Sequence, residues 1–202
     1  MAEVSEDKAD RGLANCMVFN GKPGELYLFA YGSNMNKEQI RARCANPKAI
    51  AIAKLPNHRV AFFGYSKTWD GAMETVIEAP GREVWGVIYE LSFSDWDKLD
   101  AWQDVRLNGT GAYFHYPASV TDTQGKIRTV LFYKKDILGD PQKPSREYLD
   151  FIAAGALEHG LPSSHIDGLQ RIESKKAEFD VPRRRNFGCE LFLETNCSKC
   201  GD

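Results

Sequence analysis

One short polar segment, Tyr31-Gly32-Ser33-Asn34, is a candidate binding loop. It follows the apolar run 26–30, which is typical of a buried strand, and precedes residues 37–43, whose composition is typical of a helix. A strand that turns into a helix through Gly and Ser exposes backbone N–H groups that can hold a carboxylate or a developing oxyanion. The same junction is a common helix start, at which Ser33 or Asn34 would only cap the helix. The segment alone leaves both interpretations open.

Three later segments extend this pattern. They contain Val84-Trp85-Gly86-Val87, Leu99-Asp100-Ala101-Trp102-Gln103-Asp104 and Gly160-Leu161-Pro162. In this order the segments resemble the γ-glutamylcyclotransferase (AIG2-like) family, in which a Tyr-Gly-Ser-Asn loop is followed by Val-x-Gly-Val, Leu-Asp-x-x-Glu-Gly and Gly-Leu-Pro. The resemblance extends over residues 26–173, which is most of the chain.

The resemblance implies a reaction that needs no metal or organic cofactor. In the family, the α-amine of a γ-glutamyl amide attacks the γ-carbonyl of the same molecule, which gives 5-oxoproline and releases the amine. This chemistry requires a cradle for the α-carboxylate and the oxyanion, a base for the α-ammonium and an acid for the leaving amine. Tyr31, Gly32, Ser33 and Asn34 are the expected cradle. The small-molecule substrate stays open among γ-glutamyl amino acids, γ-glutamylamines, glutathione and a carrier-bound acyl group.

The proton shuttle is where this sequence departs from the family pattern. The family's catalytic glutamate closes the Leu-Asp-x-x-Glu-Gly segment, whereas this chain has Gln103 followed by Asp104. Glutamine has the shape of glutamate but cannot exchange a proton, so we expect Gln103 to bind an ammonium or amide without acting as a base. Asp104 is the first candidate for the glutamate's place, because the longer stretch 106–111 can redirect the chain here.

Two other acids compete with Asp104 for the role of shuttle. Glu74, ranked second, and Glu78, ranked third, are four residues apart on a predicted strand and therefore lie on the same face. In the resembling proteins the equivalent strand lies near the cavity. The alternative for each is a solvated surface carboxylate. The chain is accordingly either an enzyme with a displaced shuttle or a binding protein that has kept the pocket and lost the shuttle.

Several aromatic residues are further candidates. The resemblance places Tyr113 and Tyr148 around the pocket, although a buried tyrosine often only packs its ring and satisfies its hydroxyl. Trp85, Trp96 and Trp102 lie among apolar residues, which predicts that they pack in the core.

Apolar runs and helical spacing predict an α+β fold, with a small curled mixed sheet or barrel flanked by helices. Helices interrupt the strand series rather than alternating with it, which argues against a doubly wound parallel sheet. The strands are expected at 49–52, 60–63, 75–77, 84–91, 113–120 and 129–133, after the first at 26–30. The helices are expected at 37–44, 94–102 with Ser94 as its N-cap, and 145–159.

Composition argues for a cytoplasmic protein. A net charge of −2, from 26 basic and 28 acidic side chains, gives no electrostatic reason to bind nucleic acid or an anionic membrane. No run approaches the length of a membrane span, and the N-terminus lacks the pattern of a secretory signal. Five cysteines, an odd number, suit a reducing compartment. The oligomeric state stays open, with a homodimer as one alternative.

The two ends differ in composition from the centre. Residues 1–24 are expected to form a mobile arm, 25–174 the cyclotransferase-like domain and 175–202 a basic, cysteine-containing extension. Cys197 and Cys200 form one C-x-x-C with Cys189 nearby, which is a weak zinc signal without a fourth ligand. We therefore expect incidental thiols rather than a metal site.

Overall fold

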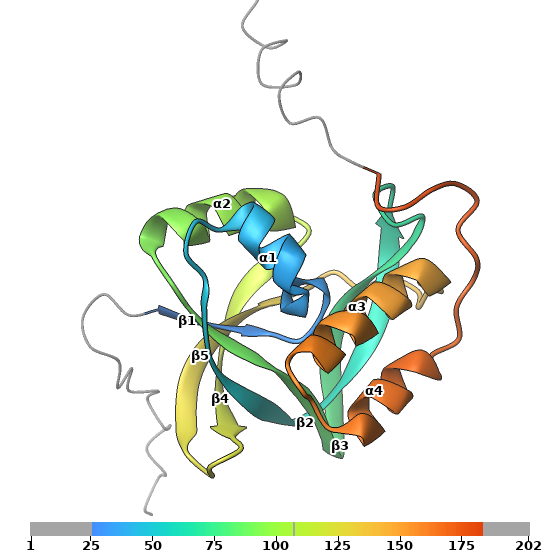
Figure 1. Ribbon diagram of the computed structural model, residues 1–202. Coiled ribbons are helices and arrows are strands. Elements are labelled where there is room, and N and C mark those ends of the chain that lie inside the picture. The colour runs from blue at the N-terminus through green and yellow to red at the C-terminus, as the bar shows by residue number, and fades with distance from the viewer. Residues whose placement is uncertain (1–25, 107, 184–202) are drawn as a thin grey trace, which may run out of the picture.

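Five strands close into a barrel in the computed structural model, which describes residues 26–106 and 108–183 (Figure 1). The strand order is β1-β3-β2-β4-β5, and all neighbours are antiparallel except β1 and β5, which are parallel. The strands are β1 (Leu26–Ala30), β2 (Lys48–Ser66), β3 (Gly71–Leu91), β4 (Phe114–Asp122) and β5 (Ile127–Lys134). The helices are η1 (Ser33–Met35, 3₁₀), α1 (Lys37–Arg43), α2 (Phe93–Gln103), α3 (Arg146–Glu158) and α4 (Ser163–Gln170). The predicted α+β fold with a small mixed barrel is confirmed.

Strands β2 and β3 form a hairpin much longer than the sequence suggested. Each was predicted as two short strands separated by Pro and Gly, but each is continuous over 19 and 21 residues. At the predicted interruption the hairpin has a β-bulge between Pro56 and His58. Asn57 in this bulge has a φ of 57°, and its side chain accepts from the Gly81 N–H at 3.1 Å. Proline is tolerated at bulges, so these residues bend the hairpin rather than end it.

All three predicted helices are present as α1, α2 and α3. The N-cap of α2 is Ser92, whose hydroxyl accepts from the Asp95 N–H at 3.2 Å, so the assignment of Ser94 was wrong. Helix α4 was not predicted. It begins directly after Pro162, whose φ of −52° is compatible with a helix start.

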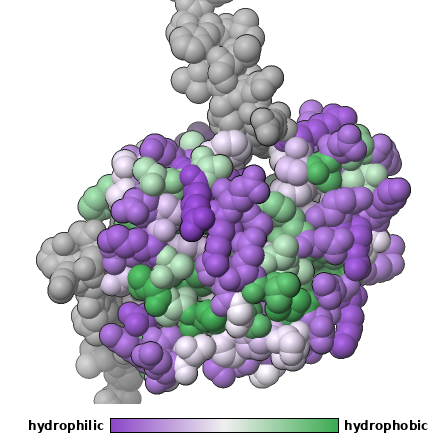
Figure 2. Space-filling model, viewed as in Figure 1, coloured by the Kyte–Doolittle hydropathy of each residue, from purple (hydrophilic) through white to green (hydrophobic). Residues whose placement is uncertain are grey.

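Alternation along β1 produces two apolar cores. Phe29 and Tyr31 join a cluster made only of strand and strand-end residues, which fills the barrel. Leu28 and Ala30 join a second cluster that includes residues of the helices. In Figure 1, α1 and α2 lie together over one end of the barrel, and α3 and α4 pack beside the β2–β3 hairpin. Hydrophilic side chains cover most of the outer face shown in Figure 2.

The three tryptophans expected in the core differ in burial. Trp96 is buried under the helices, as predicted. Trp85 is half-buried at the margin of that cluster, with its indole N–H donating to Glu83 at 3.0 Å. Trp102 is half-buried as well, and its ring lies 4.9 Å from the guanidinium of Arg43. The prediction of core packing is therefore wrong for Trp102, which lies on a helix side that meets a charged residue.

The first part of the predicted extension packs on the domain. Residues 175–183 run past α3 towards the end of the β2–β3 hairpin (Figure 1). The Arg146 N–H donates to the Lys175 carbonyl at 2.7 Å, and the Arg183 N–H donates to the Thr68 carbonyl at 2.8 Å. The predicted arm 1–24 and the three tail cysteines lie outside the described residues. No described helix is long and apolar enough to cross a bilayer.

We predict that Asp70→Asn weakens the acid dependence of stability. The Glu178 N–H and the Tyr65 hydroxyl donate to Asp70 and lower the pKa of its carboxyl below 3.8. Since the pKa is lowered on folding, the stabilisation is present above about pH 4 and is lost as the pH falls through the folded-state value. Thermal unfolding from pH 6 to about pH 2.5 should show wild type and variant converging in acid. A constant difference between the two curves would contradict this assignment.

Candidate active site

The polar loop after β1 is buried in the middle of the fold. Ser33 and Asn34 are each about 95% buried, with exposed fractions of 4% and 5%. The residue that caps α1 is Asn36, whose side-chain oxygen accepts from the Gln39 N–H at 3.0 Å. Capping therefore does not account for Ser33 and Asn34, and their side chains make other contacts.

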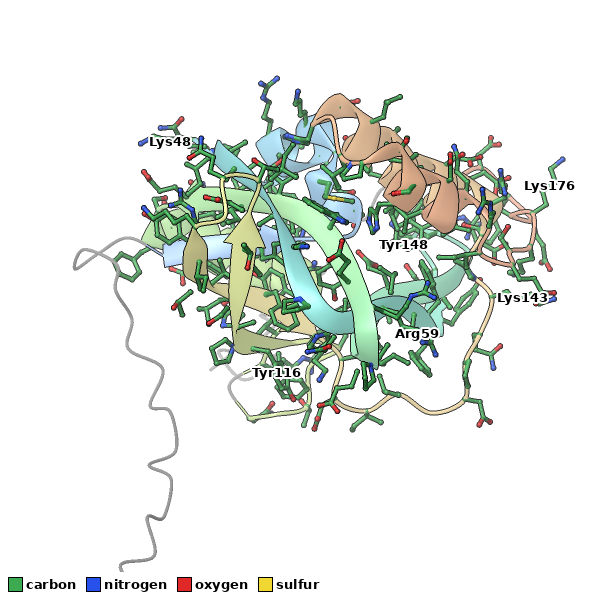
Figure 3. All side chains as sticks on the ribbon, turned by 90° about the horizontal axis from the view of Figure 1, so that it is seen from below. Lys48, Arg59, Tyr116, Lys143, Tyr148 and Lys176 are labelled. Atoms are coloured by element: carbon green, nitrogen blue, oxygen red, sulfur yellow. The ribbon has the colours of Figure 1, made fainter. Side chains whose placement is uncertain are left out.

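The Ser33 contacts lead to a buried carboxylate on β3. Glu74, with an exposed fraction of 6%, accepts at Oε1 from the Ser33 backbone N–H at 3.1 Å and from the Ser33 hydroxyl at 3.2 Å. The Tyr148 hydroxyl on α3 donates to Oε2. Figure 3 shows Tyr148 between its helix and the barrel. The loop thus holds a carboxylate, as its sequence predicted, but the carboxylate belongs to the protein.

Gly32 permits this approach because it has no side chain. A Cβ at Gly32 would lie 2.3 Å from Oε1 of Glu74, far inside van der Waals contact. A second close approach occurs at Gly155 on α3, where a Cβ would lie 2.6 Å from the Asn36 nitrogen. The two glycines allow β3 and α3 to press against the loop from different sides.

A small cavity opens beside this cluster. Residues from the end of β1, from β3, from α2 and from the flanks of β4 and β5 border it. Its walls include the following residues: Tyr31, Gly32, Asn34, Glu74, Gln103, Tyr113 and Tyr133. The structure thus brings together five predicted site residues and Glu74, the second-ranked candidate acid.

Gln103 and Asp104 have different surroundings although they are adjacent. Gln103, the last residue of α2, is half-buried and borders the cavity. Asp104 ends the helix in the left-handed region with a φ of 51°, and its carboxylate pairs with Arg106 at 2.8 Å on the surface. It does not border the cavity, so the expectation that Asp104 takes the glutamate's place does not fit its geometry. Glu78, the third candidate, is exposed near the bulge.

The two predicted tyrosines contact different atoms of Glu74. Tyr113 borders the cavity, and its hydroxyl donates to the Glu74 backbone carbonyl at 2.7 Å. Tyr148 contacts the Glu74 carboxylate from behind and does not border the cavity. Burial, and then the negative charge of Glu74, raise the pKa of both phenols well above 10. Both hydroxyls therefore stay protonated and act as donors.

Asn34 is held by two donors from α1. Its side-chain oxygen accepts from Arg43 at 2.8 Å and from Gln39 at 3.3 Å. Arg43 is also the residue that lies over the Trp102 ring. These contacts fix the Asn34 amide at the edge of the cavity and connect the loop to α1 and α2.

Lys135 is a buried residue near the site that sequence reasoning missed. Its exposed fraction is 7%, its ammonium donates to the Ala112 carbonyl at 3.3 Å, and it lies 4.8 Å from the centre of the Tyr113 ring. Burial lowers the pKa of Lys135, while the charges of Glu74 and Asp104 oppose this shift. Nothing in its local sequence, at the end of a strand, distinguishes it from a surface lysine.

Comparison with known proteins agrees with this architecture. The model of the AIG2-like family matches residues 83–169. The mouse protein named gamma-glutamylcyclotransferase is 33% identical in an alignment of 167 residues that covers 79% of this chain and 86% of the mouse protein. The chain belongs to the γ-glutamylcyclotransferase family. The human protein of the same name is 32% identical over 79% of this chain and 86% of its own length.

A solved structure agrees with the family assignment. The structure titled gamma-glutamyl cyclotransferase superimposes with a TM-score of 0.72 at 31% identity, over 78% of this chain and 93% of the other. A human protein titled uncharacterized gives a TM-score of 0.73 at 30% identity, over 78% and 94%. Within the described ranges, no three His, Cys, Asp or Glu side chains gather as a metal-binding group.

We predict that Gly32→Ala destabilises the protein by about 1–3 kcal/mol, because the added methyl collides with the Glu74 carboxylate. The matched control is Gly168→Ala in α4, where an added Cβ meets nothing within 4 Å. That change should stabilise the helix by about 0.5–1 kcal/mol. Urea unfolding measures both free energies. Wild-type stability in Gly32→Ala would show that Glu74 does not pack against the loop.

Proposed function

We propose that this protein cyclises a γ-glutamyl amide to 5-oxoproline and releases the amine. The observation that carries the proposal is the small cavity beside the Tyr31–Asn34 loop, which a buried glutamate, two amide residues and three tyrosines border. Membership of the γ-glutamylcyclotransferase family supports this choice of reaction. The substrate class is a small molecule with a free γ-glutamyl group.

The reaction suits a cavity of this kind because it is intramolecular. The α-amine and the γ-carbonyl belong to one bound molecule, so holding the chain in a folded conformation supplies much of the rate. Tyr31, Gly32, Ser33 and Asn34 are proposed to bind the substrate's glutamyl end. Gln103 can donate to the γ-carbonyl oxygen as negative charge develops there, or accept from the α-ammonium. Tyr113 also borders the cavity.

A binding protein without turnover is the second candidate. The observation in its favour is that Gln103, at the position where the family resemblance implies the catalytic glutamate, cannot exchange a proton. This candidate keeps the same cavity and the same class of ligand. Release of 5-oxoproline distinguishes the two candidates.

We predict that the purified protein releases 5-oxoproline from one or more members of a panel containing γ-glutamyl amino acids, γ-glutamylamines and glutathione. Gly32→Ala, purified in the same way, should lose about 100-fold in rate, because displacing the carboxylate and the loop disturbs substrate orientation. Gly168→Ala should retain the wild-type rate. A thermal shift with these ligands but no 5-oxoproline from any of them would support the binding protein instead.

Two cellular properties belong to the same proposal. A cytoplasmic location is inferred from the composition and the odd number of cysteines, and imaging of a tagged full-length chain tests it. A homodimer remains one alternative for the oligomeric state, and light scattering of the purified protein decides it.

A further inference from the structure

Glu74 is the one buried glutamate among residues 26–106 and 108–183. Within those ranges no Lys, Arg or His forms an ion pair with it, in contrast to Asp70 and Asp122, whose carboxylates pair with Lys175 and Arg128. Burying a carboxylate without a direct cationic partner costs stability, and the hydrogen bonds from Ser33 and Tyr148 offset that cost in part. A carboxylate that is buried at this cost is a candidate for a functional role in addition to packing.

The hydrogen bonds of Glu74 leave part of its capacity unused. A carboxylate has about four acceptor positions. The Ser33 N–H and hydroxyl take two of them at Oε1, and the Tyr148 hydroxyl takes one at Oε2. Glu74 also borders the cavity, whereas Tyr148 does not. The carboxylate is therefore held by Ser33 and Tyr148, and one acceptor position at Oε2 has no donor among the described residues.

The cavity has Gln103 on its border as well as Glu74. The family resemblance implies that a glutamate at the Gln103 position exchanges protons with the substrate. In this chain that position has lost its acid, and a carboxylate reaches the same cavity from β3. The cavity therefore has an amide where the family resemblance implies an acid, and a glutamate from β3 on the same border.

We propose that Glu74 is the proton shuttle of the cyclisation, with Ser33 and Tyr148 as positioning residues. The assignment rests on the proposed function. Glu74 takes one proton from the α-ammonium, and the freed amine forms the new C–N bond at the γ-carbonyl carbon. As the old C–N bond breaks, Glu74 returns that proton to the departing nitrogen. Glu74 then takes the second proton from the ring nitrogen and passes it to the released amine, which leaves as ammonium. No co-reactant is consumed.

The other titratable groups near the cavity are poorer shuttles. Asp104 is paired with Arg106 on the surface, and Glu78 is exposed. Tyr31, Tyr113, Tyr133 and Tyr148 are buried phenols whose pKa values are raised, so they do not accept a proton near neutral pH. Lys135 does not border the cavity, and its ammonium donates to the Ala112 carbonyl.

The first test replaces the acid by its isosteric amide. Glu74→Gln should lower kcat for 5-oxoproline release by about 100-fold or more, which is the usual contribution of general acid–base catalysis. Glu78→Gln, on the same strand, is the matched control and should keep the wild-type rate. Circular dichroism and thermal unfolding of both variants verify that each is folded. Asp104→Asn measures the competing candidate.

The second test moves the carboxylate across the cavity. Gln103→Glu in the Glu74→Gln background returns an acid to the position that the family uses. The kcat of this double variant should be at least about tenfold higher than that of Glu74→Gln. Measurement of kcat for the wild type, Glu74→Gln and the double variant at one pH reports this recovery.

The outcomes separate this assignment from the proposed function. Wild-type activity that is lost in Glu74→Gln and recovered in the double variant supports both. Wild-type activity that survives in Glu74→Gln, or that disappears in Asp104→Asn instead, leaves the function standing and overturns the assignment. A wild type that releases no 5-oxoproline, even if Gln103→Glu does, overturns both.

Discussion

A polar turn can be buried at the centre of this fold only because neighbouring elements supply its side chains with partners. After β1, a strand of the barrel wall, residues 31–36 turn through η1 towards α1 and are all buried. Unpaired backbone and side-chain polar groups at this depth would cost as much as lost hydrogen bonds. Glu74 of β3 satisfies Ser33, and Arg43 of α1 satisfies Asn34. The position of the turn therefore restricts what β3, α1 and α3 can carry.

The same constraint explains why residues distant in sequence define one site. Glu74 is 41 residues from Ser33, and Tyr148 is a further 74 residues along the chain. Their approach depends on the absence of side chains at Gly32 and Gly155. A carboxylate at the turn provides the loop with its missing acceptor and at the same time places an acid at a cavity wall. In this protein, the hydrogen bonds that satisfy the loop therefore also hold the residue that borders the cavity.

Much of the architecture could be predicted because it depends on local patterns. The strand-loop-helix order around Tyr31 and the helices near residues 37, 94 and 145 follow from apolar spacing, although the cap of α2 was assigned two residues too late. The continuity of β2 and β3 could not be predicted, since Pro and Gly mark a bulge as readily as a strand end. Helix α4 was missed because it is short and begins at a proline.

The site could be predicted only in part. The loop residues were found from their own types and order, and Tyr113 and Tyr148 from the family resemblance. The ranking of the acids depended on where each side chain points. The register of the β2–β3 hairpin decides this for Glu74 and Glu78, and the end of α2 decides it for Asp104. Asp104 lies one residue beyond Gln103, but its left-handed backbone turns it to the surface. The signal for Glu74 was a single acid within the mostly apolar stretch 72–77.

The most direct test of a shuttle on β3 is a crystal structure of Glu74→Gln with an intact γ-glutamyl substrate bound. The decisive measurement is the distance from the substrate's α-nitrogen to the side chain of residue 74. The account predicts a hydrogen-bond distance of about 2.6–3.2 Å, with the γ-carbonyl directed towards Gln103. An α-nitrogen that contacts Gln103 or Asp104 and lies beyond the reach of residue 74, even through one water molecule, would contradict it.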